Sequence, residues 1–143
     1  RQMCIRDRAG TWQIAPIDQD GTAGAEVAIA VPSPFETALG TNYDGVARYR
    51  RVLPLPAERR AHVAIEFRAV ATHATVRING VEVGQHLGGW TPFRVDATQA
   101  LQWNGADVLE VLVDEKVGHN TQGFHPIVQP HFGGIWQDVT LCL

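Results

Sequence analysis

The clearest structural signal in this sequence is a pair of short alternating runs joined by Asn79-Gly80. Residues 75–78 alternate between polar and apolar side chains, and residues 81–83 alternate again after the Asn-Gly step. Alternation of period two places successive side chains on opposite faces of a β-strand. Asn-Gly favours the two-residue turn of a hairpin, because both central residues of that turn take positive φ. The segment therefore predicts a β-hairpin with one buried face.

Other runs of strand character are short and end at Gly or Pro. They cover residues 26–31, 62–69, 108–113 and 135–141. The run 108–113 is nearly all apolar, which predicts a central strand buried on both faces. A single helical turn is expected at residues 97–102, and no long segment has the period of a helix. About seven to nine short strands in a turn-rich chain, with 14 Gly and 8 Pro, predict an all-β sandwich or barrel.

Charge and length exclude several kinds of protein. The 143 residues include 12 basic and 15 acidic side chains, which give a formal net charge of −3. All the basic residues except Lys116 are arginines scattered along the chain, so nucleic acid is not an expected partner. No apolar run approaches the roughly 18 residues of a membrane span, so no membrane partner is expected either. A complete (β/α)₈ barrel enzyme needs about 250 residues and does not fit in this length.

The two cysteines, Cys4 and Cys142, lie near the two ends of the chain, and neither has a metal-ligand pattern around it. A disulfide framework is rare at this count in a domain of this size, so we expect two unrelated thiols. Residues 1–8 carry charge but have no apolar stretch and no periodicity. We expect them to be a non-native leader to a domain at residues 9–143, which leaves the compartment open between the cytoplasm and a periplasmic or secreted location.

Several motifs follow one another in order along the chain. They are Val31-Pro32-Ser33-Pro34-Phe35, Asn42-Tyr43-Asp44-Gly45, Leu53-Pro54-Leu55-Pro56, Asn79-Gly80, Gly88-Gly89-Trp90-Thr91-Pro92-Phe93 and Gly133-Gly134-Ile135-Trp136-Gln137-Asp138-Val139. The ordered set resembles the N-terminal sugar-binding domain of glycoside hydrolase family 2, the family of β-galactosidases, β-glucuronidases and β-mannosidases. The resemblance covers residues 10–143 and implies a jelly-roll β-sandwich of the galactose-binding-like type.

The resemblance also implies which domains accompany this one. In the family, an immunoglobulin-like domain and a catalytic barrel follow the jelly roll, and we expect both to be absent from this chain. The catalytic glutamates of the family lie on the barrel, so no catalytic residue and no hydrolysis are expected from this chain alone. The parent protein is expected to be a retaining glycosidase that cleaves O-glycosyl bonds through a covalent glycosyl-enzyme intermediate.

The role that the resemblance implies for this chain is to bind carbohydrate and help to position a glycoside for the missing barrel. The expected partners are the glycoside, the missing domains of the same protein and, in an oligomer, further copies of the parent enzyme. No cofactor and no metal are expected. Two alternatives stay open, namely a free-standing carbohydrate-binding module and a purely structural domain that docks on its neighbours.

Asn42 is the first candidate for contact with the sugar. In β-galactosidases of the family, an Asn three residues before a turn Gly contacts the sugar, and Asn42 stands three residues before Gly45. An amide suits this role because it offers both a donor and an acceptor to neighbouring hydroxyls. The alternative is that Asn42 sets a turn, since Asn favours turns.

The other candidates are Trp90, Gln129 and His131. Where galactosidases and glucuronidases of the family have an Asp, this chain has Val128, so Gln129 or His131 is a candidate to bind the hydroxyls in its place. The alternative is that these residues belong to an ordinary loop with no sugar contact. Residues 118–132 form a long loop without periodicity, which is typical of a functional loop. Its histidines are too widely spaced to predict a metal site. Trp90 offers an apolar face for a sugar ring or for a domain interface, and His86 is expected to be structural.

Overall fold

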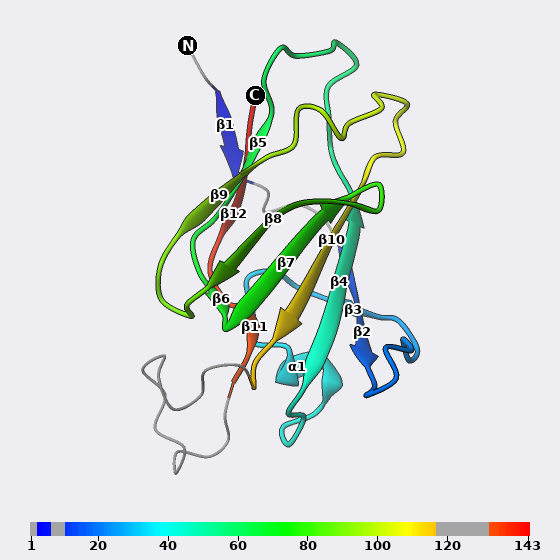
Figure 1. The fold of residues 1–143 in the computed structure, drawn as a ribbon, viewed down its shortest axis with the longest axis vertical. Coiled ribbons are helices and arrows are strands. Elements are labelled where there is room, and N and C mark those ends of the chain that lie inside the picture. Colours follow the sequence, from blue (N-terminus) through cyan, green and yellow to red (C-terminus); the bar gives the residue numbers. More distant parts are fainter. Residues whose placement is uncertain (1–2, 7–10, 117–131) are drawn as a thin grey trace.

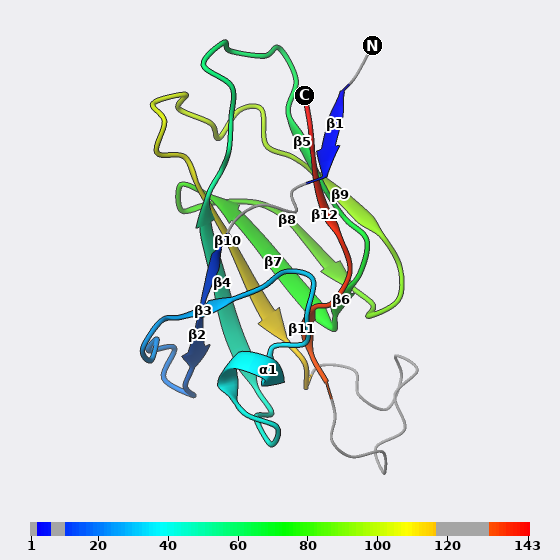
Figure 2. The same ribbon diagram turned by 180° about the vertical axis from the view of Figure 1, so that it is seen from behind.

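Two antiparallel sheets face each other in the structure, a computed structural model that describes residues 3–6, 11–116 and 132–143 (Figures 1 and 2). The larger sheet has the order β3 (Val27–Ile29), β2 (Trp12–Ile17), β4 (Val46–Val52), β10 (Val108–Asp114), β7 (His73–Ile78) and β8 (Val81–Leu87). The smaller sheet has the order β1 (Cys4–Arg6), β12 (Val139–Cys142), β5 (Ala64–Phe67) and β9 (Phe93–Asp96). A two-stranded ladder joins β6 (Val70–Ala71) to β11 (Gly134–Ile135). The predicted all-β jelly-roll sandwich is confirmed.

Strands β7 and β8 form the predicted hairpin. Ile78 pairs with Val81 across the turn, where Asn79 has a φ of 51° and Gly80 a φ of 82°. The inward residues of β7 are fully buried, while the residues between them are half-buried. The hairpin therefore forms because the turn residues accept positive φ and because the alternation gives it one apolar face.

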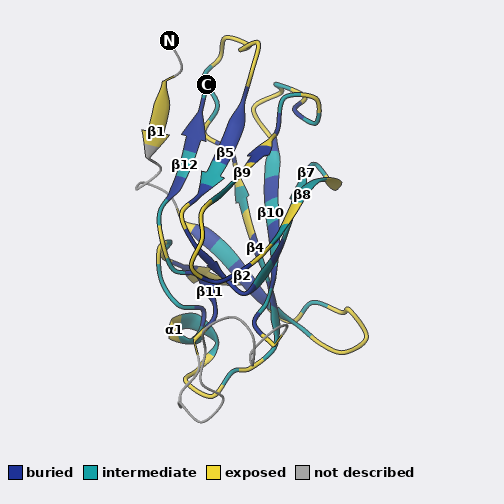
Figure 3. Ribbon diagram, turned by 60° about the vertical axis from the view of Figure 1, so that its left-hand side comes forward, coloured by how far each residue is buried: buried dark blue, intermediate teal, exposed yellow. Residues whose placement is uncertain are grey.

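The core lies between the two sheets, where the inward side chains of both are buried (Figure 3). On the smaller sheet, Val63, Ile65 and Phe67 point inward, as the alternation in residues 62–69 predicts. On the larger sheet, Trp12 packs edge-on against Tyr49, with ring centroids 6.2 Å apart. Burying a side chain of the size of Phe contributes about 1.5–3 kcal/mol, so this apolar interior is the main source of stability.

Three local predictions are wrong. β10 is central in its sheet, but only its inward residues are buried; its outer face is half-buried and carries Glu110 opposite Arg50 and Arg77. Residues 97–102 form a hydrogen-bonded turn instead of a helical turn, and residues 135–141 divide into β11 and β12. The sequence did not predict the short helix α1 (Glu36–Leu39). No helix in the described part of the chain has the length and apolar character needed to span a membrane.

The prediction of two unrelated thiols is also wrong. Cys4 and Cys142 lie opposite each other in the β1–β12 ladder, with Cα atoms 4.0 Å apart, and their sulfurs form a disulfide. The pairing comes from the register of the edge strand β1 against its neighbour β12, which no local pattern reveals, because the two cysteines are 138 residues apart in the sequence. β1 also lies within residues 1–8, the segment expected to be a leader.

Candidate functional site

Three connecting segments lie toward the end of the sandwich that is opposite the chain termini (Figures 1 and 2). They are residues 40–45 between α1 and β4, residues 88–92 between β8 and β9, and residues 132–133 before β11. Backbone hydrogen bonds join the segment before α1 to β11, from Ser33 to Ile135 and from Phe35 to Gly133. The predicted site residues Asn42 and Trp90 lie on the first two of these segments.

Asn42 is exposed in the turn that follows α1. The turn is closed by backbone atoms, because the Tyr43 N–H donates to the Gly40 carbonyl at 3.0 Å. The Asn42 side chain makes no hydrogen bond to any described residue, and the positive φ of this turn lies at Gly40. Turns favour Asn because its side chain can hydrogen bond to the nearby backbone and because Asn tolerates a positive φ. Neither reason applies to Asn42, and its amide has no partner within the described residues.

Trp90 is 54% exposed, and the adjacent β11 region supports it. Its ring meets the Trp136 ring edge-on, with centroids 5.0 Å apart. The Trp136 indole N–H donates to the Gly89 carbonyl at 2.9 Å, which fixes Trp136 against the segment of residues 88–92. An aromatic face held in this way can stack on an apolar sugar face or pack in an interface.

His86 belongs to the packing of the sheet, as expected of a structural residue. Its ring stacks on Phe93 at 4.4 Å between centroids, and Phe93 stacks on Phe67 at 4.9 Å. Burial lowers the pKa of His86, and the nearby His73 lowers it further. Its Nε2 atom lies 3.2 Å from the Thr91 hydroxyl, so the histidine helps to anchor the segment that carries Trp90.

A group of carboxyl side chains lies between α1, the 40–45 turn and β11. Glu115 is 1% exposed, and its Oε1 accepts a hydrogen bond from the Gly45 N–H at 3.2 Å. Glu36 Oε1 accepts one from the Gly133 N–H at 2.9 Å. Burial raises the pKa of Glu115 to about 9, and hydrogen bonds and charges of Asp44 and Glu36 add to the shift. No sequence pattern predicts this group, because Glu115 follows Asp114 at a charged strand end that resembles a solvated one.

Two predicted site residues, Gln129 and His131, lie outside the described residues, as does Val128. Phe132, which follows them, is 37% exposed. Among residues 3–6, 11–116 and 132–143, no group of three or more His, Cys, Asp or Glu side chains is placed to hold a metal ion.

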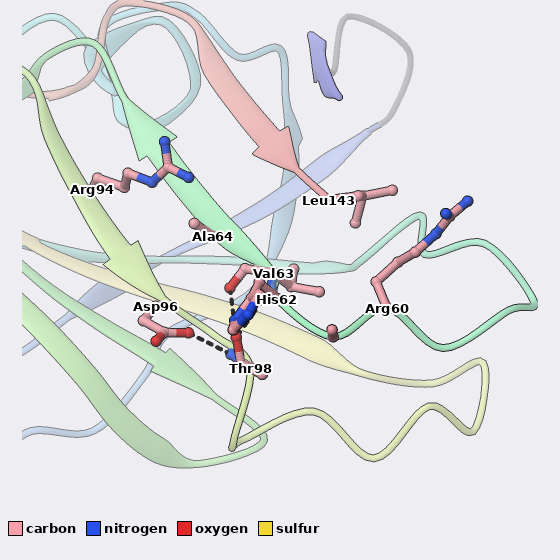
Figure 4. A pocket seen from close by; sticks show the side chains of 9 residues that line it. Arg60, His62, Val63, Ala64, Arg94, Asp96, Thr98 and Leu143 are labelled. Atoms are coloured by element: carbon pink, nitrogen blue, oxygen red, sulfur yellow. Dashed lines mark hydrogen bonds between the residues drawn. The ribbon is translucent and has the colours of Figure 1, made fainter. Parts of the chain in front are cut away.

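A groove of about 730 Å³ lies at the opposite end of the sandwich, beside the chain terminus (Figure 4). Its lining residues come from the segment before β5, from β9 and the residues after it, and from the C-terminus: Arg60, Ala61, His62, Val63, Ala64, Arg94, Asp96, Thr98 and Leu143. The Thr98 hydroxyl accepts a hydrogen bond from the Val63 N–H, and the Thr98 N–H donates to Asp96. Of the predicted sugar-binding residues that the structure describes, neither Asn42 nor Trp90 lines this groove.

The sequence matches a known protein family over most of its length. A family model described as "Glycosyl hydrolase 2 galactose-binding domain-like" matches residues 32–131. A β-glucuronidase of Formosa agariphila is 34% identical in an alignment of 104 positions, which covers 68% of this chain and 11% of that protein. A β-galactosidase of Thermoanaerobacter pseudethanolicus is 34% identical in an alignment of 104 positions, which covers 70% of this chain and 14% of that protein.

Solved structures with the same fold cover nearly the whole chain. A GH2 β-galacturonidase from Eisenbergiella tayi bound to galacturonate superposes with a TM-score of 0.79 at 27% identity, over 99% of this chain and 24% of that chain. A β-glucuronidase from Bacteroides uniformis superposes with a TM-score of 0.77 at 27% identity, over 99% of this chain and 18% of that chain. The chain therefore spans less than a quarter of the length of each relative in sequence and at most 24% of these two structures.

Proposed function

Because the chain belongs to the glycosyl hydrolase 2 galactose-binding domain-like family, we propose that it is the N-terminal carbohydrate-binding domain of a longer glycoside hydrolase. Its proposed role is to help position a glycoside for hydrolysis by a catalytic barrel elsewhere in that protein. The names of the relatives, a β-glucuronidase and a β-galactosidase, support a glycoside as the substrate. Their greater length supports the presence of further domains in the parent protein.

The observation that carries the proposal is the Asn42 amide. It is exposed, no described residue binds it, and the turn around it closes without it. An amide in this state can donate to one sugar hydroxyl and accept from a neighbouring one. Binding energy from such a contact, remote from the bond that breaks, can lower the barrier by holding the substrate in the reactive orientation.

The chemistry of the proposed parent enzyme would take place on its barrel, where one carboxyl acts as nucleophile and a second as acid and base. This chain would supply orientation only. The purified 143-residue chain should therefore release no nitrophenol from a panel of nitrophenyl glycosides. Measurable turnover by the chain alone would contradict this division of roles.

The test of the proposal is Asn42→Ala in the full-length parent enzyme, with Thr41→Ala as the matched control in the same turn. Losing one uncharged hydrogen bond costs about 0.5–1.5 kcal/mol, so kcat/KM of the Asn42 variant should fall about 2- to 13-fold. The Thr41 variant should keep the wild-type value, and both should keep the wild-type melting temperature. An Asn42→Ala enzyme with unchanged kcat/KM for the natural glycoside would rule out the contact.

The second candidate is a free-standing carbohydrate-binding module, and the exposure of Trp90 favours it. Under this alternative, the isolated chain binds a glycan by stacking, and Trp90→Ala abolishes the binding. Calorimetry against oligosaccharides distinguishes the two functions, since a positioning domain needs the barrel to form a complete sugar site. If both Asn42→Ala and Trp90→Ala leave glycan binding and turnover unchanged, the domain is a purely structural one.

A further inference from the structure

Glu115 and Glu36 lie where three separate segments meet. Glu115 follows β10, and it binds Gly45 twice, because the Glu115 N–H donates to the Gly45 carbonyl and the Gly45 N–H donates to the Glu115 carboxyl. Glu36, on α1, accepts from the Gly133 N–H next to β11. A Cβ on Gly133 would meet Glu115 Oε2, so both carboxyls lie against Gly133, and each shifts the pKa of the other. Through this contact the turn that carries Asn42 is joined to the start of β11.

Each carboxyl has one oxygen without a donor. Glu115 Oε2 and Glu36 Oε2 are both buried, and neither has a hydrogen-bond donor among the described residues. Two carboxylates cannot hydrogen bond to each other, because both are acceptors only. A pair of buried negative charges in contact would also be strongly unfavourable.

We infer that Glu36 and Glu115 share one proton, and that this protonated pair acts as a clamp which holds the 40–45 turn and the start of β11 in register. A single proton supplies the donor that both orphan oxygens lack. It also removes one of the two charges, as in other carboxyl pairs that share a proton. Any effect of the clamp on the binding of a glycoside by Asn42 rests on the proposed function. The shared proton itself does not.

Every charged or titratable described group around the pair is consistent with this assignment. Asp44, on the turn, raises the pKa of Glu115 through its side chain and its charge, and Lys116 Nζ lies 3.9 Å from Asp44 Oδ2 and balances that charge. Tyr43 on the turn and Tyr49 on β4 both have raised pKa values, chiefly because they are buried, so both stay neutral. Within the described part of the chain, no Lys, Arg or His forms an ion pair with either carboxyl of the pair.

The sign of the pH dependence follows from the linkage between folding and protonation. The pKa of Glu115 rises from an ordinary value of 4.5 to about 9 in the folded chain, first through burial and then through Asp44 and Glu36. The folded state therefore keeps a proton that the unfolded state releases near pH 4.5. Stability is fully present below that pH and falls as the pH rises toward 9, by up to about tenfold in the folding equilibrium per pH unit for one linked proton.

The test measures the melting temperature of the 143-residue chain from pH 5 to pH 9.5 in three variants. Glu115→Gln and Glu36→Gln each provide an amide N–H that donates to the partner carboxylate without a shared proton. Glu58→Gln, at an exposed carboxyl with no described contact, is the matched control. We expect the melting temperature of the wild type and of Glu58→Gln to fall with rising pH, and that of the two clamp variants to stay nearly level.

Protection of the Gly45 and Gly133 amides from hydrogen exchange gives a local readout. In the wild type, protection of both amides relative to the intrinsic rate should decrease together above pH 9, while Glu115→Gln retains it. Clamp variants that follow the wild-type pH profile would overturn the inference. So would a loss of wild-type stability at pH 8 on addition of EDTA, since a bound cation would then hold the carboxyls. If Glu115→Gln does not fold, Glu36→Gln decides the outcome, and neither readout needs a substrate.

Discussion

Replacing Asp107 with alanine should destabilise the fold by several kcal/mol, because its carboxylate joins three parts of the chain. Asp107 is 1% exposed. Its Oδ1 accepts from the Asn79 amide at 2.7 Å and from the Gln102 N–H at 2.7 Å, and its Oδ2 accepts from the Trp103 N–H at 2.9 Å. The carboxylate therefore fastens the β7–β8 hairpin to the turn before β10.

The expected magnitude follows from these three bonds. A hydrogen bond to a charged group contributes about 1.5–3 kcal/mol, but bonds to one carboxylate are not additive. Gln102 and Trp103 are not buried, so water can reach their N–H groups once the carboxylate is gone. We therefore expect a loss of about 3–5 kcal/mol in the free energy of unfolding for Asp107→Ala. For a chain of this size this corresponds to a decrease of about 6–20 °C in melting temperature.

Asp107→Asn should be less harmful. The asparagine carbonyl can keep the two bonds to Oδ1, whereas its NH₂ group faces the Trp103 N–H, so one donor loses its acceptor. We expect a loss of about 1.5–3 kcal/mol, the size of one bond to a charged group. Urea unfolding followed by circular dichroism measures both variants, with Asp20→Ala, at an exposed turn, as the control.

The pH dependence of this effect has a definite sign. Burial pushes the pKa of Asp107 upward, but the donors from Gln102, Asn79 and Trp103 outweigh it and hold the pKa below its ordinary value of 3.8. The carboxylate therefore stabilises the fold above that pH, and the stabilisation is lost as the pH falls through the lower folded value. The difference between wild type and variant should shrink in strong acid. The reasoning is refuted if the free energy of unfolding of Asp107→Ala lies within about 1 kcal/mol of the wild-type value at neutral pH, a difference that urea unfolding resolves. It is also refuted if Asp107→Asn and Asp107→Ala lower the free energy of unfolding equally.

Three further predictions concern the core and the two ends of the chain. Gly134→Ala should cost about 3 kcal/mol or more in urea unfolding, because Gly134 has a φ of 104° and a Cβ there would meet the Tyr49 hydroxyl; a loss under 1 kcal/mol would contradict this. Reducing the Cys4–Cys142 disulfide should lower the free energy of unfolding by up to about 5 kcal/mol, given the length of the closed loop. If residues 1–8 are a non-native leader, deleting them should leave a folded domain whose melting temperature equals that of the reduced chain.

The sequence predicts those elements of the fold that neighbouring residues determine. The Asn79-Gly80 turn and the alternation of β5 each carry their reason within a few residues. β2 is not among the strands that the sequence predicts, and Pro16 within it normally argues against a strand. In the structure the Pro16 carbonyl accepts from the Gly24 N–H on the side away from β4, so the missing N–H removes no bond to β4.

The side-chain network could not be predicted in this way. Asn79 was recognisable as a turn residue, but its amide also donates to Asp107 and to the Ala100 carbonyl, and its Oδ1 accepts from the Val108 N–H. These partners lie 21 to 29 residues away in the sequence. The same is true of Glu115, which is buried because distant segments close around it. Asn79→Gly separates the two roles of Asn79, since glycine keeps the positive φ and loses every side-chain bond.

The stabilising network and the candidate sugar contact lie at opposite ends of one strand. Asp107 immediately precedes β10 and Glu115 immediately follows it, so their Cα atoms lie about 25 Å apart along an extended chain. Substitutions at such a distance that share no partner are expected to add independently. Asp107→Ala should thus lower the melting temperature of the parent enzyme and leave kcat/KM for the glycoside unchanged below that temperature. Asn42→Ala should do the reverse, and a double variant should show the sum of the two effects. Strong coupling between these positions would mean that the sandwich transmits strain along β10, and that the Asn42 turn depends on the far end of the fold for its position.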